Sequence, residues 1–264
     1  MEPQHGKRVT ITDVARAAGV SPATVSQAFN GRRQVDPVTR ERIQAVALEL
    51  GYRPNPTAQR LRTGRSGMIA LLSSMPFAVA AGPSRLGFLM EIAAVAAGAA
   101  LSNGLALILV PPVEHGQLAL DALAIDGAIL VEPATDDPGL ALLRARGLPF
   151  VTVGKVAGAE DIPFVDLHST WTTNLLLQHL WAQGARQIAL MIGRQARNSY
   201  LEAETAYADF AADCHMRRRV LRIDETGGET AGRAACRRLL AEAPEIDGIC
   251  ATVDAFAVGA LQAA

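Results

Sequence analysis

Cysteine, aromatic residues and long apolar runs are all scarce in this sequence of 264 residues. Its three cysteines lie far apart, with no CxxC or Cys/His spacing, so the sequence predicts reduced core thiols rather than a disulfide framework or a metal site. The longest apolar stretch, residues 92–100, is far shorter than the ~20 residues of a membrane span. The first eight residues are polar, and no apolar segment typical of a signal peptide follows them. These absences favour a cytoplasmic protein that is not attached to a membrane.

Motifs of catalysis and nucleotide binding are also missing. The sequence contains no GxSxG, no GxxxxGK[ST], no GxGxxG after a strand and no HExxH. The cluster of Gly227, Gly228 and Gly232 favours a turn and a helix start, and the five histidines show no spacing typical of metal ligands. We therefore predict no catalytic residue, no cofactor and no metal site, and an enzyme is the least favoured class.

Charge is distributed unevenly along the chain, although the formal net charge is only −1. Residues 1–66 hold eleven Lys/Arg and five Asp/Glu, a net charge of +6. Residues 67–264 hold fourteen Lys/Arg and twenty-one Asp/Glu, a net charge of −7. A small basic segment followed by a larger acidic one indicates that the first segment alone binds a polyanion.

The first sixty residues read as short helices, predicted at residues 13–18, 23–29 and 37–50. Thr12 is the expected N-cap of the first helix, and Gly19 can adopt the left-handed conformation that ends it. Ser21 followed by Pro22 is a cap and first-turn pair that starts the second helix. Two helices joined by a short turn and braced by a third form the helix-turn-helix arrangement.

From residue 68 onward, strand and helix patterns alternate, and a boundary is predicted near residues 62–67. Near-continuous apolar runs separated by helices indicate a doubly wound α/β unit with parallel sheets. The predicted strands span residues 68–74, 105–111, 127–132, 149–154, 187–193, 220–224 and 248–253. The predicted helices span residues 86–102, 139–147, 171–184, 202–212, 230–243 and 255–263.

Residues 9–65, VTITDVARAAGVSPATVSQAFNGRRQVDPVTRERIQAVALELGYRPNPTAQRLRTGR, resemble the headpiece and hinge of LacI–GalR family transcription regulators. The shared strings are TxxDVA, GVSPATVS, TRxRI and GYRPN, and the α/β remainder resembles the family's periplasmic-binding-protein-like effector core more loosely. The resemblance implies three parts: a DNA-binding headpiece at 1–54 with its helix-turn-helix motif at 11–30, a hinge helix and linker at 55–66, and an effector-binding and dimerisation core of two lobes at 67–264.

In such a motif the second helix places its N-terminal residues at base edges in the major groove. Pro22, Ala23 and Gln27 would face the bases, and a Gln suits the N6 and N7 atoms of adenine. Position 27 often carries Arg in the family, and the alternative for Gln27 is an ordinary solvated helix residue. Polar side chains that would contact phosphates or support those contacts complete this set: Thr12, Ser21, Thr24, Ser26 and Asn30.

The resemblance gives the hinge a second role in DNA binding. Leu61 matches the family's wedge leucine, which enters the minor groove and kinks the duplex, and Ala58 would let two hinge helices approach closely. Arg62 would face phosphates or the minor-groove floor. The alternatives are ordinary packing for Leu61 and a solvated linker for the arginine.

The effector pocket of such a core lies between two lobes, at the carboxyl ends of their strands. Phe88 and Leu89 match an aromatic pair that packs against the effector, and Arg197 and Ser199 match a loop that hydrogen-bonds it. A surface arginine after a strand is the alternative for Arg197. Asp254 is expected to cap the helix at 255–263, with a position in the pocket as its alternative.

The sequence thus predicts a dimeric regulator, most simply a repressor, that binds near-palindromic double-stranded operator DNA on the nucleoid and responds to a small, sugar-like effector. The chain stops at Ala264 within a predicted helix, whereas the family continues through further strands of the second lobe. We therefore expect an incomplete second lobe. The alternative function is a truncated DNA-binding protein without working effector control.

Overall fold

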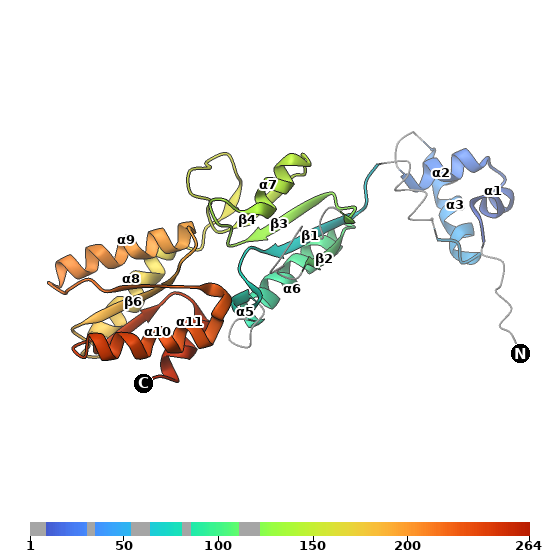
Figure 1. Ribbon diagram of the computed structural model, residues 1–264. Helices are drawn as coiled ribbons and strands as arrows, with labels where there is room; N and C mark the ends of the chain where they lie inside the picture. The colour runs from blue at the N-terminus through green and yellow to red at the C-terminus, as the bar shows by residue number, and fades with distance from the viewer. Residues whose placement is uncertain (1–8, 31–34, 54–63, 81–85, 111–121) are drawn as a thin grey trace, which may run out of the picture. The chain divides into compact units, whose positions relative to one another are not determined.

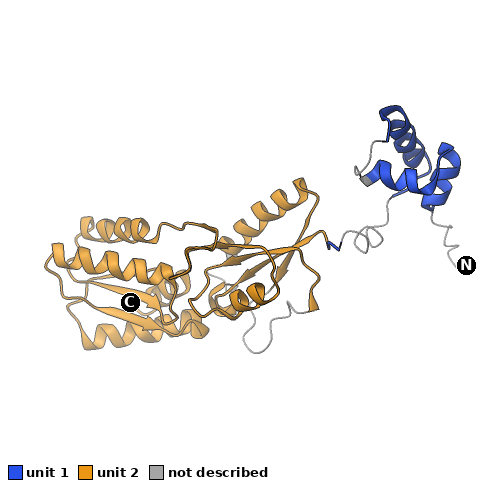
Figure 2. Cartoon of the chain, turned by 90° about the horizontal axis from the view of Figure 1, so that it is seen from above, with its two compact units in different colours: residues 1–65 blue, residues 66–264 orange. Residues whose placement is uncertain are grey.

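The computed structural model describes residues 9–30, 35–53, 64–80, 86–110 and 122–264 (Figure 1). The chain divides into two compact units, an N-terminal unit of residues 1–65 and a C-terminal unit of residues 66–264 (Figure 2). Each unit has its own hydrophobic core. Within the described residues, no helix is long and apolar enough to cross a membrane.

Three helices make up the described part of the N-terminal unit: α1 (Ile11–Ala18), α2 (Pro22–Asn30) and α3 (Pro37–Glu49). The N-cap of α1 is Thr10 and not Thr12 as predicted, because Thr10 and Asp13 form a reciprocal capping box. The Thr10 backbone N–H donates to Asp13 Oδ2 at 2.9 Å, so the helix starts at Ile11 and Thr12 lies exposed in its first turn. Gly19, with φ of 65°, ends the helix as expected.

The core of this unit is small but closed. One hydrophobic cluster contains a fully buried residue from each helix: Val14, Val25 and Ile43. Asp36 caps α3 by accepting hydrogen bonds from the Thr39 and Val38 backbone. The hydrogen bond from the Thr39 side chain, followed by these backbone bonds, lowers the pKa of Asp36. Local hydrogen bonds thus set the starts of α1 and α3, and one shared hydrophobic cluster holds the three helices together.

The C-terminal unit contains a five-stranded parallel sheet in the order β2-β1-β3-β4-β5. Alternate side chains of its strands face different helices: Leu71 packs in a cluster with Leu89 of α6 (Leu86–Ser102), whereas Leu72 packs in one with Leu143 of α7 (Pro138–Ala145). The strands are β1 (Met68–Ser73), β2 (Ala106–Val110), β3 (Gly127–Val131), β4 (Phe150–Val153) and β5 (Phe164–Val165).

A second parallel sheet of three strands has the order β7-β6-β8. Ile188 of β6 clusters with Leu177 of α8 and Tyr207 of α9, and Ala189 clusters with Leu239 of α10. The strands are β6 (Ile188–Gly193), β7 (Val220–Ile223) and β8 (Gly248–Ala251), and the helices are α8 (Ser169–Ala182), α9 (Asn198–Asp213), α10 (Gly228–Glu242) and α11 (Asp254–Leu261). We call the parts built on the two sheets the first and second lobe.

The segment that leaves the first sheet contributes to the core of the second. After β1 the chain enters α5 (Phe77–Ala80), and Met75, Val79 and Ala80 belong to the same buried cluster as β6 and β8. Figure 1 likewise shows α5 beside α11. A short 3-10 turn, η2 (Glu225–Gly227), follows β7 and contacts α5. The two lobes therefore share buried side chains.

All seven predicted strands are present, within one to two residues at each end. The two-residue strand β5 was not predicted, because Phe164 and Val165 are both exposed and show no apolar run. Helix α9 begins at Asn198 rather than at residue 202, so Ser199 lies in its first turn and not in a loop. Strand β8 forms one edge of the three-stranded sheet among the strands described.

Candidate functional site

The N-terminal end of α2 presents a small exposed surface. Ser21 Oγ accepts a hydrogen bond from the Thr24 backbone N–H at 3.1 Å, which caps the helix as predicted. Pro22 and Ala23 are exposed, and Gln27 is half-buried one turn further along. Val25 and Ala28 on the opposite side are buried in the core of the unit. The helix thus offers two small apolar side chains and one amide on its outer side.

The polar residues of this predicted set differ in their surroundings. The hydroxyls of Ser21 and Thr24 lie 2.9 Å apart, and Ser26 is half-buried. Asn30 ends α2, but its side chain lies outside the described residues. The predicted hinge residues Ala58, Leu61 and Arg62 also lie outside them.

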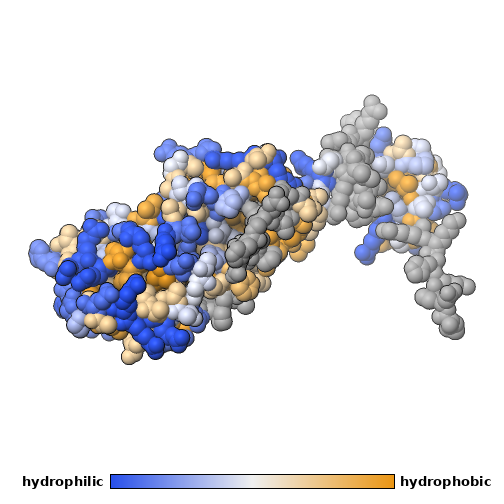
Figure 3. All heavy atoms as spheres, viewed as in Figure 1, coloured by the Kyte–Doolittle hydropathy of each residue, from blue (hydrophilic) through white to orange (hydrophobic). Residues whose placement is uncertain are grey.

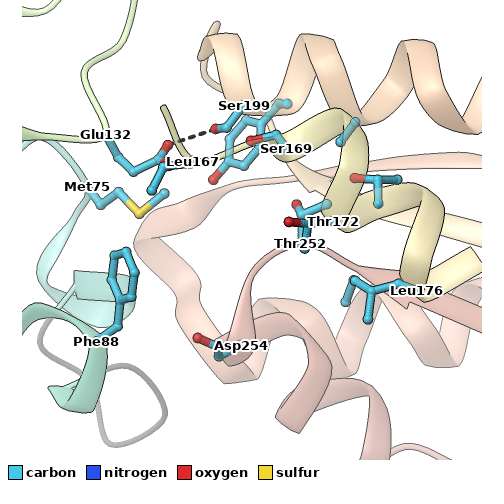
Figure 4. A pocket seen from close by; sticks show the side chains of 14 residues that line it. Met75, Phe88, Glu132, Leu167, Ser169, Thr172, Leu176, Ser199, Thr252 and Asp254 are labelled. Atoms are coloured by element: carbon cyan, nitrogen blue, oxygen red, sulfur yellow. Dashed lines mark hydrogen bonds between the residues drawn. The ribbon is translucent and has the colours of Figure 1, made fainter. Parts of the chain in front are cut away.

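A pocket of about 270 Å³ opens between the lobes of the C-terminal unit (Figure 4). Its walls come from segments that follow strands or begin helices, which is where ligands bind in parallel α/β folds. The lining residues are Met75, Phe88, Glu132, Leu167, Ser169, Thr172, Thr173, Leu176, Ser199, Tyr200, Ala203, Ala251, Thr252 and Asp254. The pocket therefore combines apolar side chains, hydroxyls and two carboxylates.

Glu132 connects the two sides of this pocket. It follows β3 directly, has a φ of 53° and is 5% exposed. Its Oε2 accepts a hydrogen bond of 2.7 Å from Ser199 Oγ at the start of α9 (Figure 4). A non-glycine residue in the left-handed region is uncommon and occurs often at functional positions. This backbone conformation holds the carboxylate in the wall of the pocket.

Arg197 does not line this pocket, contrary to the expectation that it hydrogen-bonds an effector there. Its guanidinium is 2% exposed and its Nε donates to Glu225 Oε1 at 3.0 Å. Nη1 donates to Ser74 Oγ at 3.1 Å and to the Glu132 carbonyl, and Nη2 donates to the Ser74 carbonyl at 3.1 Å. Arg197 is therefore neither a surface arginine nor a wall residue, but a buried link between the two lobes.

The partner of Arg197 is held by a second residue. The Tyr200 hydroxyl donates to Glu225 Oε1 at 2.8 Å, and burial, reinforced by the negative charge of Glu225, raises the pKa of Tyr200 well above its ordinary value. Gly193 at the end of β6 makes room for this group, because a Cβ there would lie 2.5 Å from the Tyr200 ring. The buried charges of Arg197 and Glu225 are thus paired with each other and hydrogen-bonded.

The other predicted effector residues take different places. Phe88 is half-buried and lines the pocket, whereas Leu89 is buried against the first sheet with Leu71 and Val131. Asp254 is the first residue of α11 and lines the pocket, and Val253 stands at the N-cap without a side-chain bond, so the predicted capping role of Asp254 is wrong.

Glu132, Thr252 and Met75 were missed because no motif marks them. Each follows an apolar strand within two residues, and this position at a carboxyl end is the signal that could have found them. Among the described residues, no group of His, Cys, Asp and Glu side chains could hold a metal ion.

The chain matches two family models in succession. Residues 10–55 match the bacterial regulatory proteins of the lacI family, and residues 78–264 match the periplasmic binding proteins and sugar binding domain of the LacI family. The chain is also 32% identical to the HTH-type transcriptional regulator CelR of Thermobifida fusca, over 98% of its own length and 78% of that protein. The chain belongs to the LacI family.

Solved structures of LacI-family regulators have the same fold. A CelR–cellobiose complex is similar with a TM-score of 0.63 and 27% identity, and a lac repressor dimer bound to operator and the anti-inducer ONPF with a TM-score of 0.71 and 26% identity. Each similarity covers 97% of this chain and 77% of the solved chain. The chain is also 26% identical to the HTH-type transcriptional regulator RafR of Escherichia coli and covers 64% of that protein.

Membership in the LacI family gives each unit its class. The N-terminal unit is a helix-turn-helix domain of a DNA-binding transcription regulator, and the C-terminal unit is an effector-type domain of the periplasmic-binding-protein fold. The family consists of transcription regulators and not of enzymes.

Proposed function

We propose that this LacI-family protein is a transcriptional repressor that binds a near-palindromic operator as a homodimer and changes its DNA affinity when a small sugar-like molecule enters the pocket between the lobes. The observation that carries the proposal is the pocket itself, which is lined from both lobes by hydroxyls, carboxylates and an aromatic ring. A ligand bound there contacts both lobes, so it favours one lobe arrangement over another.

In this proposal the outer side of α2 reads the DNA sequence. Gln27 contacts a base edge, and the small apolar side chains of Pro22 and Ala23 allow close approach in the major groove. Contacts to DNA phosphates position the helix. They come from Asn30 and from four hydroxyl-bearing residues in or near the helix: Thr12, Ser21, Thr24 and Ser26. The hinge carries the second DNA contact, with Leu61 as a minor-groove wedge, Ala58 at the contact between hinge helices and Arg62 at the backbone.

In the effector pocket, Phe88 and Ser199 contact the ligand directly, and Leu89 packs in the same hydrophobic cluster as Phe88. Arg197 joins the two lobes and does not contact the ligand, because its guanidinium already donates hydrogen bonds to Glu225, Ser74 and the Glu132 carbonyl. Ligand-induced movement between the lobes would have to rearrange these bonds.

The homodimer is supported by an apolar surface on the first lobe. Val95 and Leu101 on α6 are 75% and 71% exposed, and Leu109 on β2 is 43% exposed. Figure 3 shows more apolar surface over the half that holds the first sheet than over the half that holds the second. Large exposed apolar side chains gathered on one helix favour association. A two-fold dimer matches a palindromic site.

We further propose that the protein works in the cytoplasm, at the nucleoid, and has no catalytic activity. The regulator class of its relatives supports both statements. Its cysteines add support, because burial raises the pKa of Cys250 to about 12 and that of Cys236 above its ordinary value, as expected for unreactive core thiols.

The test is selection of bound duplexes from a random-sequence DNA library, followed by gel shifts on the selected site with and without candidate sugars. We expect a two-fold symmetric consensus, and at least one sugar that changes affinity for it severalfold. Selection of no consensus would contradict the DNA-binding part. A consensus whose binding no sugar alters would favour a DNA-binding protein without effector control.

A further inference from the structure

Two short segments, one from each lobe, lie against each other beside the pocket. Residues 132–135 follow β3 in the first lobe, and residues 196–199 lead into α9 in the second. The backbone N–H and the hydroxyl of Thr135 both donate to the Ala196 carbonyl, at 2.8 Å and 2.9 Å, and an isolated antiparallel bridge joins the same segments. We call this contact the interlobe seam.

Arg197 crosses the interlobe seam with its guanidinium. It belongs to the second lobe, but three of its hydrogen bonds end on atoms of the first lobe. Nη1 donates to Ser74 Oγ at 3.1 Å and to the Glu132 carbonyl, and Nη2 donates to the Ser74 carbonyl at 3.1 Å. Ser74 follows β1 and Glu132 follows β3, so both carbonyls lie where the strand ladders end and take donors from outside the sheet.

The orientation of this guanidinium is fixed from the side of the second lobe. The Arg197 and Glu225 side chains are 2% and 1% exposed, and Nε donates to Glu225 Oε1 at 3.0 Å. The Tyr200 hydroxyl donates to the same oxygen at 2.8 Å. Because a guanidinium is planar, a fixed Nε also fixes the directions of both Nη groups. The buried pair therefore presents the two Nη groups to the first lobe.

From this geometry we infer that Arg197 is a clasp that holds the two lobes together before any ligand binds, and that Glu225 and Tyr200 are positioning residues that aim it. The clasp bonds only join protein atoms, so they form without an effector. Separating the lobes would remove charge-assisted donors from two carbonyls and one hydroxyl. The inference goes beyond the proposed function, because it concerns the protein without sugar and without DNA.

A second interlobe contact provides a comparison. Lys155, which follows β4 in the first lobe, has its Nζ 3.3 Å from Glu202 Oε1 on α9 and 2.9 Å from Asp166 Oδ2. Its side chain is 35% exposed, whereas that of Arg197 is 2% exposed. Solvent-exposed ion pairs contribute little to stability. The clasp should therefore depend on Arg197 and not on Lys155.

The Thr135 amide reports on the interlobe seam, because its hydrogen bond to Ala196 breaks when the lobes separate. Hydrogen exchange is measured at single-amide resolution on the full chain, without sugar or DNA, for the parent and for Arg197→Met. We expect the Thr135 amide to be protected in the parent and to exchange about tenfold faster or more in the variant. The amides of Ala128 and Leu190, which are bonded within the first and second lobe, should keep their rates.

A double variant distinguishes the clasp from an ion pair that only stabilises the second lobe. Arg197→Met alone leaves Glu225 as a buried charge without its partner, which is destabilising. Adding Glu225→Gln removes that charge and keeps an acceptor for the Tyr200 hydroxyl. We expect the double variant to have the parent rate at Leu190 and the fast exchange at Thr135. Parent rates at both amides would overturn the inference.

Two single variants test positioning and burial. Glu225→Gln keeps Arg197 but removes its charge partner, and we expect the Thr135 amide to exchange about threefold faster or more. An unchanged rate would show that Glu225 does not position the clasp. Lys155→Met is the matched control and should change the rate by less than about twofold. An effect equal to that of Arg197→Met would overturn the inference.

The parent protein supplies the last outcome. If its Thr135 amide exchanges as fast as in an unstructured peptide, the interlobe seam is open without a ligand and the clasp is wrong. These measurements involve neither DNA nor a sugar. Failure of the clasp would therefore leave the proposed function standing, and failure of the library selection would leave the clasp standing.

Discussion

Gln27 is the only amide on the outer side of the described part of α2, next to the exposed Pro22 and Ala23. A glutamine pairs best with adenine and an arginine with guanine. In the Gln27→Arg variant we therefore expect one symmetric half-site position to change from adenine to guanine, by about 1–3 kcal/mol per contact. The measurement is repeated library selection with parent and variant. An identical consensus would remove Gln27 from the base-reading residues, and Arg16→Gln on α1 serves as a control that should leave the consensus unchanged.

Asp247 is a second residue whose role can be isolated. Its carboxylate accepts hydrogen bonds from the backbone N–H groups of Arg186, at 2.9 Å, and Gln187, at 2.7 Å, just before β6. Burial alone would raise the pKa of Asp247, but these bonds outweigh it and lower the pKa below its ordinary value. The ionised form is thus favoured in the folded state, so its contribution is present at neutral pH and is lost as the pH falls below about 4.

We expect Asp247→Asn to reduce the free energy of unfolding at pH 7 by roughly 0.5–1.5 kcal/mol, the range for a hydrogen bond in a protein. Urea unfolding of parent and variant at pH 7 and pH 3 measures this. The difference between the two proteins should narrow at pH 3, because the Asp247 side chain of the unfolded parent is then largely protonated and the folded state no longer gains its full preference for the charged form. A constant difference at both pH values would contradict the role of the charge.

Some residue roles followed from local sequence and others did not. The cap at Ser21 and the stop at Gly19 depend on neighbours within three or four residues, and both predictions are confirmed. The position of Arg197 depends on Glu225 and Ser74, which lie 28 and 123 residues away in the chain. Only the folded arrangement of two lobes brings these groups together, so no local pattern could show that the guanidinium is occupied.

At the scale of elements, helices α10 and α11 pack so closely that their backbones touch. A Cβ on Gly259 would overlap the Glu229 carbonyl and lie 2.6 Å from the Arg233 nitrogen, and a Cβ on Gly232 would lie 2.7 Å from the Phe256 Cα. Backbone atoms cannot rotate away as a side chain does, so an added methyl group must separate the helices.

The Gly259→Ala variant should therefore lose about 1–3 kcal/mol of stability, as overpacked cores do, although alanine is intrinsically the better helix former. Thermal or urea unfolding gives the value. Arg237→Ala, at an exposed position of α10, is the control and should change stability by less than about 0.5 kcal/mol. Unchanged or increased stability of Gly259→Ala would show that the two helices are not in close contact.

Strands and helices were the best-predicted features because their signal is periodic. Buried parallel strands such as Ile188–Gly193 are apolar throughout, and their short length between turn residues favours a strand over a helix. Strand β5 is only two exposed residues, and its pairing with β4 arises from its neighbour rather than from its own sequence. Pocket residues such as Glu132 were assigned to strands because a single position separates the end of β3 from the pocket wall.

For the whole molecule, the net charge of +6 on residues 1–66 predicts a steep salt dependence of DNA binding. A dimer with several phosphate contacts in each subunit should lose roughly 10³-fold or more in affinity between 50 mM and 200 mM salt. Gel shifts or fluorescence anisotropy over this range measure the slope. Binding of a neutral sugar should change little over the same range, and a flat DNA titration would argue against a basic N-terminal unit that contacts phosphates.

The residues between β1 and α6 have a consequence for how the C-terminal unit unfolds. Met75, Val79 and Ala80 leave the first sheet and are buried with the second, so the core of the second lobe is incomplete when the first lobe is denatured. The boundary between the lobes is thus a place where a ligand fits but not a boundary between folding units. We expect a single cooperative transition of residues 66–264, with equal midpoints for near-ultraviolet signals from Trp181 in the second lobe and for proteolysis in the first. Two separate midpoints would show that the lobes unfold independently.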